Sequence, residues 1–360
     1  MNLKKNNHHI FAKLAFNQAS INQGSTGTNP SVGCVLEKNG TVLSSAVTAI
    51  GGRPHAESIA LDKCNKLSNA NIYISLEPCT HYGKTPPCTS KIIRNNIKKV
   101  FFSSRDLDKR TNGKSIKILK KNKINVQTGF YKKEVNYFYK SYFLYLKKKL
   151  PLVDAKIAIS RDYFTKNKKN KWITNEDSRK RAHLIRSKYD CLITTSKSIN
   201  DDNSLLNCRI EGLEKKSPSI AIIDRKLTLQ KNLKIFKKKS YRNIYLFTEK
   251  NNPIKEKYLK SKGIKIIKIS KMSDKKNYKE ILLKLVNLKY SRFLLESGLI
   301  LLKFFLKANF IHNLYIFQSD KLLKKNGFNY TNSLFLKKLK IKKKIKVYLG
   351  NDNLYKVRIK

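Results

Sequence analysis

Four residues in the first quarter of the chain have the types and the spacing of a hydrolytic metal site. They lie in three short segments, Pro54-His55-Ala56-Glu57, Glu77-Pro78-Cys79 and Pro86-Pro87-Cys88. Zinc in a hydrolytic site takes three protein ligands and keeps a fourth position for water, and His55, Cys79 and Cys88 supply that set. A carboxylate two residues after the histidine can move protons without being a ligand. The pattern therefore predicts a zinc site for hydrolytic deamination, with Glu57 as the catalytic acid and base.

Taken singly, each of these residues has a structural alternative. His55 alone would be a satisfied core histidine, and a lone cysteine would be a small buried residue. Their joint occurrence with the flanking prolines and Glu57 favours the metal site. The spacing departs from that of common nucleobase deaminases, whose second cysteine comes three residues after the first. Here Cys88 follows Cys79 by nine residues.

The long insert Cys79–Cys88 and the segment Thr28–Cys34 resemble the deaminase half of the RibD family, the bifunctional deaminase/reductases of riboflavin biosynthesis. The resemblance is specific over residues 25–90 and looser over the rest of the chain. It implies a phosphorylated small-molecule substrate, 2,5-diamino-6-(5-phosphoribosylamino)pyrimidin-4(3H)-one. The deaminase replaces the 2-amino group of this pyrimidine by oxygen and releases ammonia.

By this resemblance, three further residues bind the pyrimidine substrate. Asn29 matches the position that binds the ring, while His81 and Lys84 match insert residues that orient the substrate and its anionic end. An amide can pair with a ring edge, and a lysine supplies a point charge for phosphate. As structural alternatives, Asn29 is a turn residue before Pro30, and Lys84 is one more solvated lysine.

The C-terminal part, residues 150–360, resembles the reductase half of the same family, which uses NADPH to reduce the ribosyl group to ribityl. No Gly-x-Gly-x-x-Gly follows a strand, so a Rossmann domain has no support. The resemblance implies that the substrate-binding residues are Asn170, Arg186, Leu206, Arg209 and Glu296. It implies that the cofactor-binding residues are Ile159, Trp172, Ser198, Asp202, Arg225 and Gly298. Alternatively, Arg186 and Arg209 are ordinary surface charges and Trp172 is a core aromatic.

Three positions in this part depart from the family pattern. Tyr163 stands where the family usually has glycine, Asn203 stands where it has a second acid, and Leu299 stands where it has proline or alanine. A bulky residue at a glycine turn strains the backbone or narrows a pocket. A second hypothesis therefore keeps the deaminase and makes the reductase part a degraded, structural domain.

Hydrophobic periodicity and turn residues predict an α/β fold in two domains. Residues 1–149 are expected to form a cytidine-deaminase-like three-layer α/β/α domain, and residues 150–360 a dihydrofolate-reductase-like α/β domain, joined at the charge run Lys147–Pro151. Predicted helices span residues 7–21, 54–61, 86–96, 131–146, 176–187, 277–288 and 298–308. Predicted strands span residues 32–36, 42–49, 72–76, 100–103, 152–159, 191–195, 220–223, 244–247, 264–267 and 293–295, with a C-terminal hairpin formed by 345–349 and 355–359.

The net charge of +54 motivates a third hypothesis, an RNA-binding or tRNA-editing deaminase. However, only thirteen of the 78 basic residues are arginine, and the lysines run the whole length without forming one block. Because nucleic-acid-binding proteins usually cluster their charge and favour arginine, a lysine drift caused by A/T-rich coding is the favoured interpretation. We therefore expect no nucleic-acid partner.

Location and assembly are predicted from what the chain lacks and from the family. The most apolar segment, Phe293–Ile311, is interrupted by Glu296, Lys303 and Lys307, and the N-terminus has no uninterrupted apolar core. Six cysteines are too sparse for a disulfide scaffold, which favours a reducing compartment. We expect a cytoplasmic enzyme without a membrane partner, and by resemblance a homo-oligomer.

Overall fold

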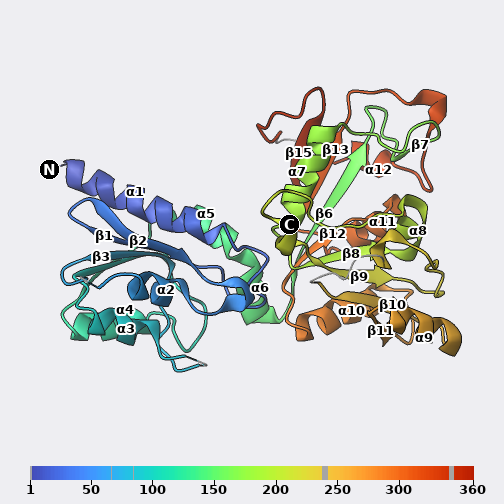
Figure 1. Ribbon diagram of the computed structural model, residues 1–360. Coiled ribbons are helices and arrows are strands. Elements are labelled where there is room, and N and C mark those ends of the chain that lie inside the picture. The colour runs from blue at the N-terminus through green and yellow to red at the C-terminus, as the bar shows by residue number, and fades with distance from the viewer. Residues whose placement is uncertain (1, 66, 84, 237–241, 340–343) are drawn as a thin grey trace. The chain divides into compact units, whose positions relative to one another are not determined.

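The computed structural model describes residues 2–65, 67–83, 85–236, 242–339 and 344–360 (Figure 1). The chain folds as two compact units, Met1–Leu150 and Pro151–Lys360. The division falls one residue after the boundary expected between residues 149 and 150. Each unit has its own sheet, as the predicted α/β fold requires.

The N-terminal unit alternates helices with short, mostly buried strands. Its strands are β1 (Gly33–Lys38), β2 (Thr41–Val47), β3 (Asn71–Leu76), β4 (Lys99–Ser104) and β5 (Asn125–Thr128). Its helices are α1 (Asn2–Ala19), α2 (Ala56–Asp62), α3 (Cys88–Arg94), α4 (Lys114–Lys121), α5 (Lys132–Phe138) and α6 (Lys140–Lys148). The strands form one sheet in the order β2-β1-β3-β4-β5, in which β3, β4 and β5 are parallel.

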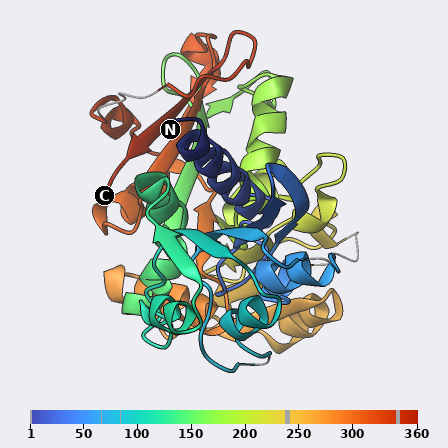
Figure 2. The same cartoon turned by 90° about the vertical axis from the view of Figure 1, so that its left-hand side faces the viewer.

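Alternating side chains give this sheet two apolar faces. Val35, Tyr73 and Phe101 pack against α1, which lies along the sheet in both views (Figure 1, Figure 2). Leu36, Ile72, Ile74 and Phe102, which alternate with them, belong to the second core cluster, with residues of α2, α3 and α4. The predicted three-layer α/β/α domain is confirmed, and the sheet order brings the ends of β3 and β4 side by side.

The C-terminal unit is built on a larger sheet. Its strands are β6 (Leu152–Ile159), β7 (Lys166–Asn167), β8 (Cys191–Thr195), β9 (Ser219–Ile223), β10 (Ile244–Thr248), β11 (Ile264–Lys268), β12 (Arg292–Leu295), β13 (Asn313–Gln318), β14 (Gly327–Phe328) and β15 (Asn353–Arg358). Its α-helices are α7 (Glu176–Arg186), α8 (Ser196–Asp202), α9 (Pro253–Ser261), α10 (Lys275–Asn287), α11 (Leu299–Lys307) and α12 (Leu334–Lys337). The large sheet has the order β11-β10-β9-β8-β12-β6-β13-β15, and β7 pairs separately with β14.

In the large sheet, every described strand pair except β13–β15 is parallel. The carboxyl ends of β6, β8, β9 and β12 therefore meet at one edge. Because β12 inserts between β8 and β6, the chain changes direction across the sheet at that point. Open α/β sheets bind ligands outside the carboxyl ends of their strands at such a switch point.

The predicted strands all lie on observed strands except at the C-terminus. There β15 pairs along its length with β13. The other arm of the predicted hairpin is not a strand: its backbone meets β15 at the Lys344–Tyr355 bridge and at the bond from the Ile345 amide to the Leu354 carbonyl. The predicted helix 131–146 is wrong as a single element, because α5 ends before Tyr139 and α6 begins after it. Among the described residues, no helix combines the length and apolar character needed to cross a bilayer.

Candidate active sites

Each candidate zinc ligand lies where an element begins or ends. His55 is the N-cap residue of α2, Cys79 follows the end of β3, and Cys88 is the first residue of α3 after the N-cap Pro87. Proline fits the start of a helix because the amide it lacks would have no partner there. Free amides at a helix start favour a thiolate, and the Cys88 amide donates to the Cys79 sulfur at 3.3 Å.

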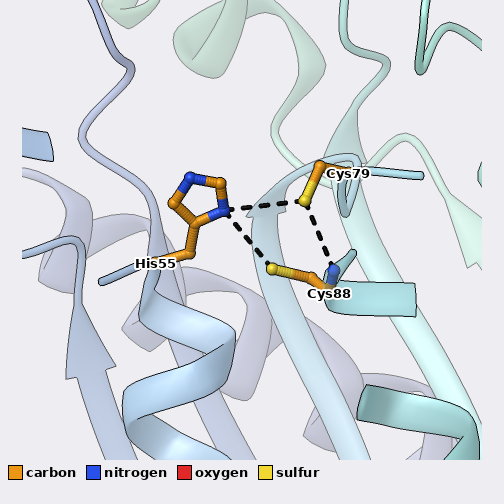
Figure 3. A group of neighbouring side chains, drawn as sticks. All are labelled: His55, Cys79 and Cys88. Carbon is orange, nitrogen blue, oxygen red and sulfur yellow. Dashed lines mark hydrogen bonds between the residues drawn. The ribbon is translucent and has the colours of Figure 1, made fainter. Parts of the chain in front are cut away.

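The three side chains converge on one point (Figure 3). His55 Nδ1 lies 3.4 Å from Cys88 Sγ and 3.6 Å from Cys79 Sγ, and all three ligand atoms lie within 4.8 Å of one another. In a tetrahedral zinc site, the standard Zn–S and Zn–N bond lengths separate sulfur and nitrogen by about 3.5 Å. The donor set and its spacing therefore fit a zinc ion with one histidine and two cysteine ligands.

The local electrostatics favour one thiolate in this cluster. The hydrogen bonds from the Cys88 thiol and from His55 lower the pKa of Cys79 to about 4. The pKa of Cys88 is raised, because its thiol donates to Cys79 and because the side chain is buried. The hydrogen bond to Cys79 raises the pKa of His55. The hydrogen bonds among these three side chains hold protons that a bound divalent cation would displace.

Glu57 lies in the first turn of α2, two residues from His55, and its side chain is 3% exposed. Burial raises the pKa of this carboxyl group. Among the described residues, its Oε2 atom is one of six buried side-chain oxygen or nitrogen atoms without a hydrogen-bond partner. A buried polar atom without a partner is costly, so this oxygen is available for a ligand.

The candidate pyrimidine-binding residues lie on loops of the same unit. Asn29 donates through Nδ2 to the Gly52 carbonyl at 3.3 Å, three residues before His55. Gly52 has a φ of 87°, and a Cβ there would lie 2.5 Å from Asn29 Nδ2, so glycine is required for this packing. His81 is half-buried, and its Nδ1 lies 3.3 Å from Thr111 Oγ1. Lys84 lies outside the described residues.

In the C-terminal unit, several candidate residues gather at the carboxyl edge of the large sheet. Ile159 ends β6, Ser198 lies in the first turn of α8 just after β8, and Arg225 follows β9. Glu296 and Gly298 follow β12, and Gly298 is the N-cap residue of α11. Thr195 caps α8 by accepting from the Ser198 amide at 3.2 Å. Four strand ends thus bring together residues that are far apart in the sequence.

Glu296 is the centre of a buried ion cluster at this edge. Arg186 grips it with two bonds, Nε to Oε1 at 2.6 Å and Nη2 to Oε2 at 2.8 Å. Lys156 Nζ lies 3.4 Å from Oε2. Although burial opposes it, the charge of Arg186 and then of Lys156 lowers the pKa of Glu296 to about 2. The bonds to Glu296 occupy Nε and Nη2 of Arg186, the pair of nitrogens that would otherwise bind a phosphate in a bidentate way.

The neighbouring loop carries Leu206 and Arg209. Asn207 between them accepts through its carbonyl from His183 Nδ1 at 2.8 Å and from Arg186 Nη1 at 3.1 Å. Arg209 is exposed, and its pKa is lowered by partial burial and by the nearby charges of Arg186 and Arg179. Arg209 is therefore a solvent-exposed guanidinium near the charges of Arg186 and Arg179, and such a group would attract a phosphate.

The remaining candidates lie on the segment between β7 and α7 and at the end of α8. Asn170 and Trp172 are exposed, and Arg179 of α7 stacks on the Trp172 ring at 4.9 Å, so Trp172 is not a core aromatic. Asp202 ends α8 and pairs with Lys166 of β7 at 2.8 Å. Tyr163 has a left-handed φ of 67°, so the backbone of this turn keeps the conformation that favours glycine.

The comparisons with known proteins agree with this division. The family model of the RibD C-terminal domain matches residues 151–354, and that of the cytidine and deoxycytidylate deaminase zinc-binding region matches residues 5–104. Riboflavin biosynthesis protein RibD of Aquifex aeolicus (strain VF5) is 32% identical over 316 residues, which are 87% of this chain and 87% of that protein. The chain belongs to the RibD family.

Other family members give the same result. RibD of Buchnera aphidicola subsp. Baizongia pistaciae (strain Bp) is 32% identical over 91% of this chain and 89% of its own length. The crystal structure of the Thermotoga maritima diaminohydroxyphosphoribosylaminopyrimidine deaminase/5-amino-6-(5-phosphoribosylamino)uracil reductase is 26% identical, has a TM-score of 0.83, and matches over 99% of both chains. The chain therefore carries the zinc-binding deaminase domain and the NADPH-dependent reductase domain of a bifunctional RibD of riboflavin biosynthesis, which confirms the predicted fold class and cofactors.

Sequence reasoning missed two polar residues that the structure brings to these sites. Lys156 joins Glu296 although 140 residues separate them along the chain, so no local motif announces the pair. Glu77 lies in the Glu77-Pro78-Cys79 segment, two residues before a candidate zinc ligand. Its position next to a proline and a candidate ligand was the available signal.

Proposed function

We propose that the N-terminal unit deaminates 2,5-diamino-6-(5-phosphoribosylamino)pyrimidin-4(3H)-one, the substrate class named for the Thermotoga maritima relative. The observation that carries this proposal is the convergence of His55, Cys79 and Cys88 beside the unpartnered oxygen of Glu57. In this proposal, these three residues are the zinc ligands and Glu57 is the catalytic residue. Asn29, His81 and Lys84 bind the substrate.

The chain's own residues divide the work of hydrolytic deamination. Zinc, when bound, supplies the Lewis acidity that makes water nucleophilic near neutral pH. Glu57 takes a proton from the attacking water and gives it to the ring nitrogen. It then takes the proton of the newly added hydroxyl group and gives it to the amine, which leaves as ammonia while the carbonyl forms. Its burial and raised pKa suit a group that must both accept and donate a proton. Asn29 holds the ring edge through the oxygen and the second amide hydrogen that Gly52 leaves available.

We also propose that the C-terminal unit reduces the ribosyl group with NADPH at the carboxyl edge of its sheet. NADPH supplies the hydride, and the candidate residues for holding it are Ile159, Trp172, Ser198, Asp202, Arg225 and Gly298. The Gly298 N-cap supports this, because free amides at a helix start can meet a phosphate of the cofactor. Opening the ribose ring requires a proton on its oxygen, and Lys156, paired with Glu296, is the ammonium group placed to donate it.

The substrate-binding residues of this unit act in two ways. Asn170, Leu206 and Arg209 lie on the loops around the edge, and Arg209 is the guanidinium at the surface that fits the substrate phosphate. Arg186 and Glu296 form the buried pair. Because the Arg186 fork is bound to Glu296, we propose that Arg186 supports this carboxylate and does not grip the phosphate directly.

A deaminase with an inactive reductase domain is the second candidate. Tyr163 favours it, because a tyrosine at a φ of 67° strains a turn that follows β6. The two candidates differ in one assay. Purified protein with zinc and the diaminopyrimidine phosphate is supplied with NADPH, and ammonia and NADPH absorbance are followed. Ammonia without NADPH oxidation would select the second candidate.

Assembly and location remain part of the proposal. We propose a homo-oligomer formed through the C-terminal unit, in the cytoplasm, with no nucleic-acid or membrane partner. Sedimentation velocity of the full chain tests it, since a single monomeric species at micromolar concentration would contradict the oligomer.

A further inference from the structure

We propose that Glu77 is a positioning residue of the deaminase site: it ties the loop that carries Cys79 to the loop of residues 105–113, which in turn holds His81. This inference rests on the proposed function, because it assigns a purpose to residues that support a proposed ligand and a proposed substrate contact. The loop of residues 105–113 joins β4 to α4 and is called the β4–α4 loop below.

The Glu77 carboxylate is buried and fully engaged. Its side chain is 3% exposed. Oε2 accepts from the backbone amides of Asp106 at 3.2 Å and Gly113 at 3.1 Å, and Oε1 accepts from Ser115 Oγ at 2.7 Å. The Glu77 amide donates to the Ser104 carbonyl at 2.9 Å, which continues the pairing of β3 with β4. One side chain thus holds both ends of the β4–α4 loop.

The first turn of α4 shows why a carboxylate is needed there. Its N-cap residue is Gly113, which has no side chain to cap the helix. A helix start favours a negative charge and a hydrogen-bond acceptor, and Glu77 supplies both from the neighbouring strand end. Replacing it by alanine would leave two backbone amides and one hydroxyl without this partner in a buried place.

The β4–α4 loop touches the insert between the two cysteines at two points. Thr80 Oγ1 donates to the Arg110 carbonyl at 2.7 Å, and Thr111 Oγ1 lies 3.3 Å from His81 Nδ1. Thr80 and His81 directly follow Cys79. The β4–α4 loop, which Glu77 holds in place, therefore contacts the start of the insert. A hydrogen bond between Thr111 and Nδ1 leaves Nε2 of His81 for the substrate.

A matched control lies at the opposite end of the same sheet. Glu37 is also buried, and its carboxylate also accepts three bonds, from the Gly40 amide, Asn71 Nδ2 and the Tyr73 hydroxyl. It pairs with Asn71, the first residue of β3, whereas Glu77 follows the last residue of β3. A variant without the Glu37 carboxylate measures how much stability the unit loses when a buried carboxylate is removed far from the Cys79 loop.

The experiment compares the full-length chain with its variants E77A, E77Q, E37A and T111V. Each protein is loaded with cobalt(II), whose d–d absorption reports the ligand geometry, and KM and kcat for deamination are measured on the zinc-loaded proteins. We expect E77A to change the cobalt spectrum and to raise KM about tenfold. E77Q should restore most of both, because its amide oxygen can accept from the Asp106 and Gly113 amides.

The remaining variants separate positioning from general stability. E37A should lower the melting temperature but keep the wild-type cobalt spectrum and KM, and T111V should raise KM without changing the spectrum. A wild-type spectrum and KM in E77A, or equal changes in E37A, would overturn the proposal. If E77A does not fold, the T111V and E77Q variants decide. A wild-type KM in T111V would contradict the proposal. Failure of the wild-type chain to bind cobalt would instead overturn the zinc site itself.

Discussion

At the scale of single residues, the surroundings of Glu57 give the clearest support for a catalytic role. It is buried two residues from His55, its pKa is raised by burial, and one of its oxygens has no partner among the described residues. Buried polar atoms usually have a hydrogen-bond partner, and Glu57 combines an unpartnered oxygen with a place beside the candidate ligand His55. These surroundings support the proposed proton transfer by Glu57.

The first prediction is that E57Q retains zinc but loses deamination. An amide of the same shape cannot take a proton from water, so kcat should fall by about 10²- to 10⁴-fold. Zinc content is measured by atomic absorption and ammonia release by a coupled assay. E37Q, which changes another buried carboxylate, is the control and should keep its activity. An E57Q variant with wild-type kcat would contradict the role of Glu57.

The second prediction concerns His183 in the C-terminal unit. Burial, followed by the charge of Arg186, lowers the pKa of His183 to about 4 from a usual 6.5. Because the unfolded chain binds the proton more readily, the native state should lose about 3 kcal/mol of stability from this group as the pH falls from 6.5 to 4. Above pH 6.5 the contribution is complete.

Urea unfolding followed by the fluorescence of Trp172, the single tryptophan, measures this effect in the C-terminal unit. In H183N the amide can keep the bond to the Asn207 carbonyl but cannot take up the proton. The wild-type stability should therefore fall more steeply with acid than that of H183N. Parallel pH dependences in the two proteins would contradict the prediction.

The convergence of the candidate zinc ligands was predictable because each belongs to a short motif. His55 and Glu57 are two residues apart, and the two cysteines follow prolines in one insert. The Arg186–Glu296 and Lys156–Glu296 pairs span 110 and 140 residues, so only the fold brings them together. The family resemblance implied that Arg186 binds the substrate, whereas the structure pairs it with Glu296.

At the scale of elements, the strands were the most predictable part of the fold. Strands β6 and β8 are mostly apolar, apart from Asp154 and Lys156 in β6 and two threonines at the end of β8, and their observed bounds equal the predicted ones. Helix α9 was missed although Asn252 caps it and Pro253 opens it. Its lysine-rich sequence hides the apolar stripe that marks a packed helix. The break at Tyr139 was missed because the side chains on both sides of it continue the same pattern.

The third prediction tests the packing of α1 on β1. Gly33 faces the helix so closely that a Cβ would lie 2.5 Å from the Ala19 amide nitrogen, within backbone that cannot move aside. G33A should therefore destabilise the N-terminal unit by about 2–3 kcal/mol. G40A, in the β1–β2 turn at a φ of 85° with open space around it, should cost only about 1 kcal/mol. Thermal unfolding of the two variants measures the difference, and equal losses would contradict this account of the packing.

At the scale of the whole molecule, the two activities draw on different units. His55, Cys79 and Cys88 are the only group of at least three His, Cys, Asp or Glu side chains placed to hold a metal in the described part of the chain, and they lie in the N-terminal unit. The Glu296 cluster lies in the C-terminal unit. The net charge of +54 is spread over both parts and marks neither site.

The fourth prediction follows from this separation. Removal of zinc with a chelator should abolish ammonia release, while NADPH oxidation with the deaminated pyrimidine as substrate should continue at about its original rate. Readdition of zinc should restore deamination. Loss of both activities on chelation, in protein whose circular dichroism is unchanged, would contradict the assignment of one activity to each unit.

The most direct test of the central claim uses the unmodified chain. Zinc-loaded protein is given the diaminopyrimidine phosphate, with and without NADPH, and ammonia release and NADPH absorbance are recorded together. We predict ammonia in both cases and NADPH oxidation in step with it when the cofactor is present. No ammonia from zinc-loaded, folded protein would contradict the deaminase assignment, and ammonia without NADPH oxidation would contradict the bifunctional one.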